Sequence, residues 1–315
     1  MKHLALATVA AALSLQTAVF AQDSTDFGPL ISVQDLVATQ AEVDPLVIDI
    51  RAANEDGYAG GHIAGAVSAP YGLFRGPAEN PGQLVPEDKL TEVLRSLGVT
   101  TDRPTVVVHQ GSNETDFGAA ARVYWTLKSS GVSQLAILNG GINAWTEAGE
   151  ALEKTIVTPT PSDITVSFSD QWLATSDEVL AVVNGEQNAL LLDARPEEFW
   201  SGQTSHAAAA KPGTLPQSKY FTHSTWFGGG PVIVDADAAR DLAAQQGFTD
   251  ESEIVSFCNT GHWAATNWFA LSELAGIENV KLYPESMVGW SNKGYEMANV
   301  PGLLQNLWTQ IKSVF

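Results

Sequence analysis

Cysteine is almost absent from this sequence: Cys258 is the only one in 315 residues. A chain with one thiol cannot form an internal disulfide and cannot supply a cysteine-based zinc site. Positive charge is also scarce, because 16 lysines and arginines stand against 36 aspartates and glutamates, for a net charge of −20. This balance argues against binding to nucleic acid or to anionic membranes. A small anionic substrate would therefore need a local pocket of positive charge.

Long hydrophobic runs are found only near the N-terminus. Lys2 and His3 precede an apolar, alanine-rich stretch over residues 4–20, and Val19-Phe20-Ala21 has small residues where signal cleavage requires them. The run is short for a membrane anchor and a polar segment follows at once, so we predict a signal peptide at residues 1–21. We expect an exported protein, periplasmic in a Gram-negative source, without membrane contact after cleavage. A lone thiol in an oxidising compartment is exposed to oxidation, so its presence favours a functional role.

The two halves of the chain repeat one order of elements. A strand over residues 46–50 runs into the D-x-R motif of Asp49, and a strand over 190–194 runs into that of Asp193. Trp145 follows Asp49 by 96 positions, and Trp290 follows Asp193 by 97. This agreement indicates two copies of one domain. We assign an N-terminal domain, a Pro/Thr-rich linker, a C-terminal domain and a C-terminal helix, at residues 22–150, 151–163, 164–301 and 302–315 respectively.

Short apolar runs alternate with helical patterns within each copy. Further strands are predicted at residues 105–109, 135–138, 254–257 and 280–283, and helices at 87–97, 119–128, 237–246 and 264–274. This alternation predicts an α/β fold in which each domain has a mainly parallel sheet with helices on both faces. Loops at the carboxyl ends of such strands are the usual functional sites.

Cys258 lies at one of these strand ends, between the predicted strand 254–257 and the helix from Ala264. Loop N–H groups and a helix N-terminus there would favour the reactive thiolate, whereas the competing interpretation is a cysteine packed as a small hydrophobe. A cysteine phosphatase would need an arginine at Ala264, and His262 is too near in sequence to be the base of a cysteine protease. The first copy has Gln110 at the corresponding loop start, so we predict that it is non-catalytic.

Taken together, these motifs resemble the tandem-domain rhodanese family, the thiosulfate and 3-mercaptopyruvate sulfurtransferases. The resemblance spans about residues 31–301 and is carried by the two D-x-R motifs together with G-H-I-A-G-A from Gly61, V-V-V-H-Q-G from Val106, L-N-G-G-I-N-A-W ending at Trp145 and C-N-T-G-H-W from Cys258. It implies two tandem rhodanese-like domains that use neither a cofactor nor a metal.

The resemblance also implies a covalent mechanism. The Cys258 thiolate would take a sulfane sulfur from a small anionic donor such as thiosulfate, and the persulfide would pass it to a thiol, to cyanide or to a protein acceptor. The substrate-binding residue implied for the anionic donor is Arg195, for which an ion pair with Asp193 is the competing interpretation. The residues implied around the persulfide are those of the loop, Asn259, Thr260, Gly261, His262 and Trp263.

The loop departs from the family's usual donor patterns, because Asn259 and Thr260 are neutral where thiosulfate-using relatives often carry cations. A larger or less charged donor, including 3-mercaptopyruvate, therefore stays open. A second hypothesis is a sulfur carrier that binds a persulfide sulfur and turns over little free thiosulfate. A third, a purely structural binding module, leaves the exported free cysteine unexplained.

Overall fold

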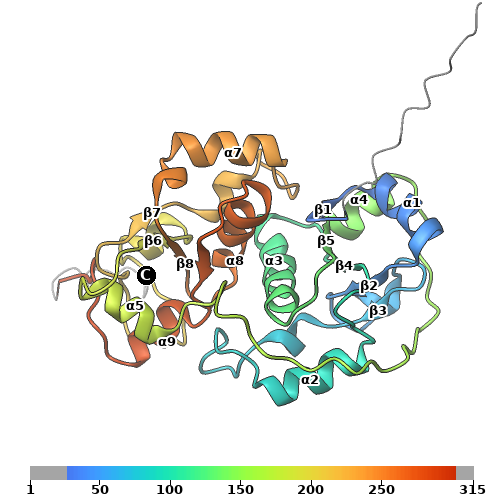
Figure 1. Cartoon of the computed structure of the whole chain (residues 1–315), viewed down its shortest axis with the longest axis horizontal. Coiled ribbons are helices and arrows are strands. Elements are labelled where there is room, and N and C mark those ends of the chain that lie inside the picture. The colour runs from blue at the N-terminus through green and yellow to red at the C-terminus, as the bar shows by residue number, and fades with distance from the viewer. Residues whose placement is uncertain (1–26, 303–315) are drawn as a thin grey trace, which may run out of the picture.

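The computed structural model of the protein describes residues 27–302. The predicted signal peptide and C-terminal helix lie outside these residues, apart from Gly302. Figure 1 shows two halves, each a sheet flanked by helices, in contact along α3 and α8 at the centre of the molecule. No helix within residues 27–302 is long and apolar enough to cross a membrane.

The first sheet is parallel throughout, with the strand order β1-β5-β4-β2-β3. Its strands are β1 (Leu30–Ile31), β2 (Leu46–Asp49), β3 (Val67–Ser68), β4 (Thr105–Val108) and β5 (Leu135–Leu138). Successive strand residues point to opposite faces, so Val47 and Val106 pack under α1 and α4 while Ile48 and Val107 pack under α2 and α3. The helices of this half are α1 (Val33–Val43), α2 (Glu87–Ser96), α3 (Glu114–Ser129) and α4 (Gly141–Glu147), with short 3-10 turns η1 (Tyr58–Gly60) and η2 (Tyr71–Phe74).

The second sheet repeats this arrangement in the order β7-β6-β8-β9, again parallel. A single parallel bridge between Leu173 and Leu282 stands where β1 stands in the first sheet. The strands are β6 (Leu190–Asp193), β7 (Lys219–Tyr220), β8 (Ile254–Phe257) and β9 (Val280–Leu282). The helices are α5 (Ser176–Val183), α6 (Glu197–Trp200), α7 (Ala236–Gln245), α8 (Trp263–Trp268) and α9 (Ser286–Asn292), with turns η3 (His223–Trp226) and η4 (Phe248–Asp250). The family fold class predicted from the sequence is therefore confirmed.

The helix predicted over residues 264–274 forms, but its second half is a π-helix, η5 (Phe269–Leu274). Its last turn is closed by the Ala275 N–H, which donates to the carbonyl of Ala270 at 2.8 Å. π-helical turns are rare and often occur near functional sites. Here the wider turn follows directly on the helix that begins at the cysteine loop.

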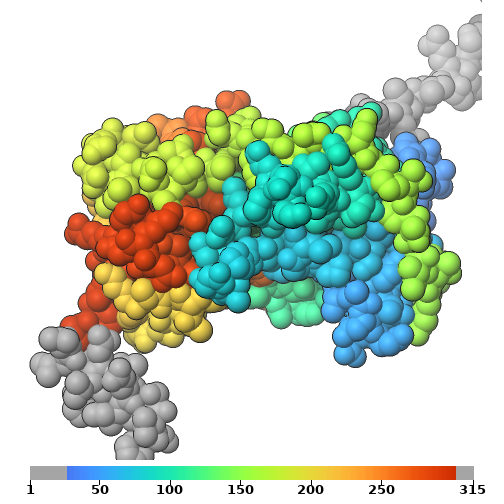
Figure 2. All heavy atoms as spheres, turned by 90° about the horizontal axis from the view of Figure 1, so that it is seen from below, coloured from blue at the N-terminus to red at the C-terminus, as the bar shows by residue number. Residues whose placement is uncertain are grey.

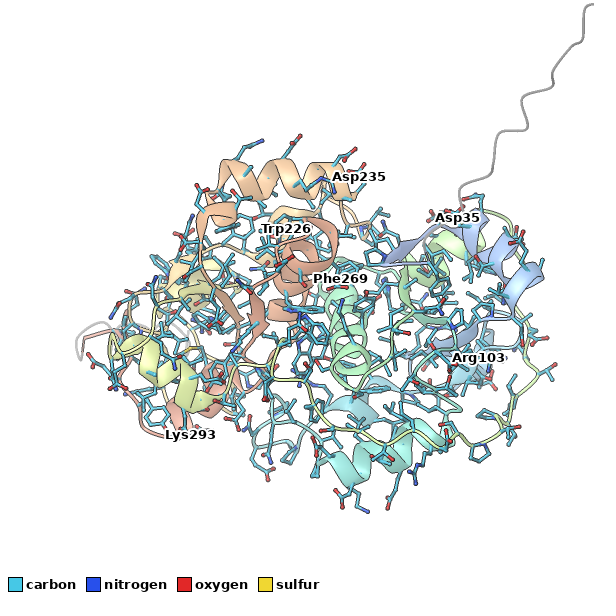
Figure 3. All side chains as sticks on the ribbon, in the orientation of Figure 1. Asp35, Arg103, Trp226, Asp235, Phe269 and Lys293 are labelled. Carbon is cyan, nitrogen blue, oxygen red and sulfur yellow. The ribbon has the colours of Figure 1, made fainter. Side chains whose placement is uncertain are left out.

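The two halves share one hydrophobic core across α3, α8 and η5. Phe269, labelled in Figure 3, makes an edge contact with Phe117 of α3 at a ring-centroid distance of 5.6 Å. Tyr124 donates to Glu273 at 2.8 Å, and Lys128 pairs with the same carboxylate at 2.7 Å. In Figure 2 the cyan segment that follows η2 reaches the second half, where Asn80 donates to Glu285 at 3.3 Å. Burial of this apolar surface fixes the two sheets relative to each other.

Candidate active site

Cys258 follows β8 directly, at the carboxyl edge of an interior strand. Its side chain is only 1% exposed. The first turn of α9 anchors the loop from the other side, because Met287 N–H donates to the Cys258 carbonyl and Val288 N–H to the Asn259 carbonyl, both at 3.0 Å. The thiol is therefore placed by two elements, a buried strand and a neighbouring helix.

Ser286 braces this loop with its side chain. The hydroxyl accepts the N–H of Cys258 at 3.0 Å and that of Gly261 at 3.2 Å, and donates to the Tyr283 carbonyl at 2.7 Å. The backbone of Ser286 has a φ of 49°, in the left-handed region that disfavours residues with a Cβ. A serine held in this conformation, with its hydroxyl fully used, is typical of strain retained at a functional site.

Most other N–H groups of the loop are free. Those of Asn259, Thr260, His262 and Trp263 donate to no acceptor among the described residues. Several backbone N–H groups converging in one turn make a concavity that suits an anion. The loop therefore offers dipoles, without formal charge, to a thiolate or persulfide at Cys258.

The first half of the molecule covers this loop with Tyr71, Arg75 and Arg122. Arg122 of α3 is 1% exposed and donates to the Gly261 carbonyl at 3.3 Å. The Arg75 guanidinium stacks over the Tyr71 ring at 5.2 Å from its centroid. Both halves therefore contribute to the surroundings of the cysteine loop. The formal positive charges of Arg75 and Arg122 come from the half without a cysteine.

His262 links the two halves in its neutral form. Its Nε2 lies 2.6 Å from the Thr115 carbonyl, which can only accept, so Nε2 donates and Nδ1 accepts from the Tyr71 hydroxyl at 2.9 Å. Burial lowers the pKa of His262 to about 4, and the charge of Arg75 acts in the same direction. Burial also raises the pKa of Tyr71, which keeps its hydroxyl protonated as the donor. A Cβ at Gly118 would lie 3.0 Å from the imidazole, so the close approach of α3 needs glycine there.

Trp263, the last residue of the loop, packs against aromatic side chains of its own half and hydrogen-bonds to the first half. Its ring stacks on His223 with centroids 5.1 Å apart, meets Phe199 edge-on at 5.8 Å, and donates from Nε1 to the Thr115 hydroxyl at 3.1 Å. Asn259 and Thr260 are buried, at 4% and 8% exposure. The structure therefore brings together every loop residue predicted around the persulfide, although their roles stay predictions.

Comparison with known proteins decides the family. The model of the rhodanese-like domain matches residues 32–148 and again residues 175–293. This chain belongs to the rhodanese family. Each match falls on one of the two repeats, and the predicted family resemblance is confirmed.

Related rhodanese-family proteins include a sulfur carrier and sulfurtransferases. The sulfur carrier protein TtuD of Thermus thermophilus is 26% identical over 245 residues, which are 75% of this chain and 84% of that protein. SseB of Mycobacterium tuberculosis, provisionally named a thiosulfate sulfurtransferase, is 26% identical over 275 residues, covering 84% and 94%. The crystal structure of the 3-mercaptopyruvate enzyme SseA of Escherichia coli shares the fold, with a TM-score of 0.69 at 23% identity over 82% of this chain and 98% of that one.

A further structural neighbour is the anaerobic ergothioneine biosynthesis enzyme from Chlorobium limicola in complex with trimethyl histidine. It has a TM-score of 0.75 at 19% identity and covers 86% of this chain and 70% of that one. At this identity the likeness shows the shared fold alone.

The residue of the first rhodanese-like copy that corresponds to Cys258 is His109, and the prediction of Gln110 was wrong by one position. Asp49 pairs with Val108 in the first sheet, and Asp193 pairs with Phe257 in the second. The next residue in each strand end, His109 or Cys258, accepts an N–H from the following helix. The error arose because the predicted strand over residues 105–109 included His109, whereas β4 ends at Val108. Imidazole is not a sulfur nucleophile of this kind, so the expectation of a silent first copy is unchanged.

In the first copy, the loop that corresponds to the Cys258 loop holds a carboxylate of the protein itself, that of Asp116. Asp116 Oδ2 accepts the N–H groups of Gly111 at 2.6 Å and Ser112 at 3.0 Å and lies 3.4 Å from His109 Nδ1. Burial alone would raise the pKa of Asp116, but His109 and the two N–H donors outweigh it and lower the pKa. A protein carboxylate therefore fills the concavity that the Cys258 loop leaves to its sulfur.

Arg195 is held in an ion pair with Asp193. Its Nη2 lies 2.6 Å from Asp193 Oδ2 and 2.9 Å from the Gly213 carbonyl, and its Nη1 donates to Asn259 at 3.3 Å. Arg51 makes the same pattern with Asp49, Gly61 and Gln110 in the copy without a cysteine. The geometry matches the competing interpretation, and the donor-binding role of Arg195 stays a prediction.

Sequence reasoning missed Tyr71, Arg75, Arg122 and Ser286. Ser286 replaces Gly141 of the first copy, a one-residue difference that alignment of the repeats could have shown. Arg75 and Arg122 are scarce cations in the half predicted to be silent, and only the packing of α3 on α8 brings them to the loop. No group of three or more histidine, cysteine, aspartate or glutamate side chains within residues 27–302 is arranged to hold a metal ion.

Proposed function

We propose that this rhodanese-family protein is a sulfurtransferase that carries a sulfane sulfur as a persulfide on Cys258, with thiosulfate or a similar anion as the donor. The observation that supports it is the placement of the only cysteine at the start of a loop in which four N–H groups have no acceptor among the described residues. Such groups stabilise a sulfur anion without being charged themselves. The first copy lacks this arrangement because Asp116 already occupies its loop.

The proposed reaction has two balanced steps. The Cys258 thiolate attacks the outer sulfur of thiosulfate, a new S–S bond forms, and the old S–S bond breaks with its electron pair leaving on sulfite. A thiol or cyanide then attacks the outer sulfur of the persulfide and restores the thiolate, giving a new persulfide or thiocyanate. The loop N–H groups would hold the persulfide charge between the two steps.

Intact-mass measurement after donor treatment tests this proposal. We expect the wild-type protein to gain one sulfur atom from thiosulfate and to lose it on addition of cyanide. Cys258→Ser should show neither the adduct nor thiocyanate formation, because no second cysteine can replace it. Failure to form the adduct with thiosulfate, 3-mercaptopyruvate and polysulfide alike would contradict the proposal.

A sulfur carrier is the second candidate, and the burial of Cys258 favours it. A thiol that is 1% exposed can hold a persulfide away from small acceptors until a partner docks. A stable adduct with negligible turnover on cyanide would support this alternative, and the acceptor would then be a protein thiol. 3-Mercaptopyruvate remains in the donor panel as the third possibility.

We also propose that the protein acts after export. The predicted signal sequence at residues 1–21 supports this. Cell fractionation of the native host, with N-terminal sequencing of the mature protein, would test it. A mature N-terminus at Met1 in the cytoplasmic fraction would contradict it.

A further inference from the structure

Arg122 is buried and Arg75 is partly buried, and neither guanidinium group is paired with a carboxylate of the described residues. Within residues 27–302, neither forms an ion pair, whereas the buried Arg51 and Arg195 each carry an aspartate. The chain has only 16 basic residues against 36 acidic ones, so counter-charges are plentiful. Buried charges are normally paired, and two unpaired cations side by side need an explanation.

Both guanidinium groups keep a hydrogen-bond donor unused inside the protein. Arg122 donates from Nη1 to Gly261 and from Nη2 to the Gly82 carbonyl at 3.2 Å, but its buried Nε has no acceptor among the described residues. The buried Nη1 of Arg75 likewise has none. Cationic N–H donors form strong, charge-assisted hydrogen bonds with oxyanions, and these two donors have no acceptor within the described part of the protein.

The two cations also disfavour each other. Burial, together with the charge of Arg75, lowers the pKa of Arg122 to about 9, while Tyr71 and Cys258 act in the opposite direction. These effects place Arg75, Arg122 and Cys258 in one electrostatic neighbourhood. An anion that bound there would relieve the repulsion between the two guanidinium groups and satisfy their unused donors.

We infer that Arg75 and Arg122, both from the first half of the molecule, bind the oxyanion group of the sulfur donor while its outer sulfur lies against Cys258. This inference rests on the proposed sulfurtransferase function and deepens it, because it names a sulfonate-like anion as the group recognised. The first half then supplies the formal charge that the loop lacks, since Asn259 and Thr260 are neutral.

A purely architectural role for the pair explains less. Arg122 does join the halves through Gly82 and Gly261. This role accounts for its two terminal nitrogens but not for the unused Nε. At Arg75 it accounts for the stacking on Tyr71 but not for the unused Nη1. A neutral donor at Arg122 would serve the same two carbonyls without the burial of a charge.

Alkylation of Cys258 by a matched pair of reagents tests the anion site without requiring sulfur transfer. Iodoacetate carries a carboxylate and iodoacetamide is neutral, and their rate ratio is normalised to that for free cysteine. We expect wild-type protein to favour iodoacetate and Arg75→Gln to lower the normalised ratio by about tenfold or more, as for loss of a charged hydrogen bond. Arg75→Lys should retain part of the preference. Arg240→Gln on exposed α7, which removes the same charge elsewhere, should leave the ratio unchanged.

The same variants are compared for persulfide formation from thiosulfate and from polysulfide. The inference expects Arg75→Gln to raise KM for thiosulfate far more than for polysulfide. An unchanged alkylation ratio in both Arg75→Gln and Arg122→Gln, in protein with wild-type thermal unfolding, would overturn it. If Arg75→Gln unfolds, the folded Arg75→Lys variant is used instead. Its inhibition constant for sulfite should then exceed that of the wild-type protein, and an unchanged constant would overturn the inference. A shifted ratio without any persulfide would keep the anion site and reject the proposed function, whereas a persulfide with unchanged ratios would do the reverse.

Discussion

Substitutions of Ser286 by alanine and by glycine can distinguish the energetic cost of its strained backbone from the stabilisation by its hydroxyl group. Its hydroxyl makes three hydrogen bonds in the interior, to Cys258 N–H, Gly261 N–H and the Tyr283 carbonyl. Each such bond contributes roughly 1 kcal/mol, so their loss should cost about 2–3 kcal/mol of unfolding free energy. The left-handed φ of 49° disfavours any residue with a Cβ, by about 1 kcal/mol. Glycine relieves that cost and alanine retains it.

We therefore expect Ser286→Ala to lose about 2–3 kcal/mol in urea unfolding and Ser286→Gly about 1 kcal/mol less than that. Activity should respond differently. Both variants lose the same hydroxyl, so both should slow persulfide formation equally, by about tenfold or more, because the loop N–H groups are no longer held in place. Quenched-flow intact mass gives this rate directly.

Ser96→Ala on α2 is the matched control, since it removes the same oxygen from an exposed serine remote from the loop. Wild-type persulfide formation in Ser286→Gly would refute the bracing role. Equal stability of the glycine and alanine variants would refute the argument from backbone strain, whatever their activity.

Two further predictions concern buried charge. Burial lowers the pKa values of His262 and His223 to about 4, so the folded state binds fewer protons than the unfolded one, whose histidines titrate near 6.5. Unfolding free energy should fall by about 2 kcal/mol for each histidine, about 4–5 kcal/mol in all, between pH 7 and 4.5. The fall should be about half as large in His262→Gln, and a flat pH profile would contradict this. Asp193→Asn should cost about 3–5 kcal/mol because it leaves buried Arg195 without its counter-charge, and near-native urea unfolding of that variant would contradict a structural ion pair.

The sequence predicted the fold well because its signals are local. The four-residue runs at 135–138 and 254–257 form strands with the predicted bounds, since a continuous apolar run between turn residues suits a strand buried on both faces. Helix α3 begins five residues before its predicted start because Asn113 caps it, accepting the N–H of Asp116 at 3.0 Å. The apolar period does not show such a cap, because the first turn is polar.

The cysteine loop could also be found from local sequence, but its surroundings could not. Arg122 is 139 positions from Gly261 and reaches it only because α3 packs on α8. The family resemblance implied a donor-binding role for Arg195, and the structure shows an ion pair between Arg195 and Asp193. A repeat thus predicts which copy has the nucleophile without showing what the other copy contributes.

The division of roles between the copies follows from the charges of the proposed reaction. A thiolate that attacks a dianionic donor brings like charges together, which costs several kcal/mol at contact distance in a partly buried site. The loop around Cys258 provides neutral dipoles, and its own half holds Arg195 on Asp193. The compensating cations, Arg75 and Arg122, belong to the other half. The docking of α3 against α8 is therefore part of the proposed catalytic apparatus, and a second copy folded alone would keep the thiol while losing the charges that draw its donor.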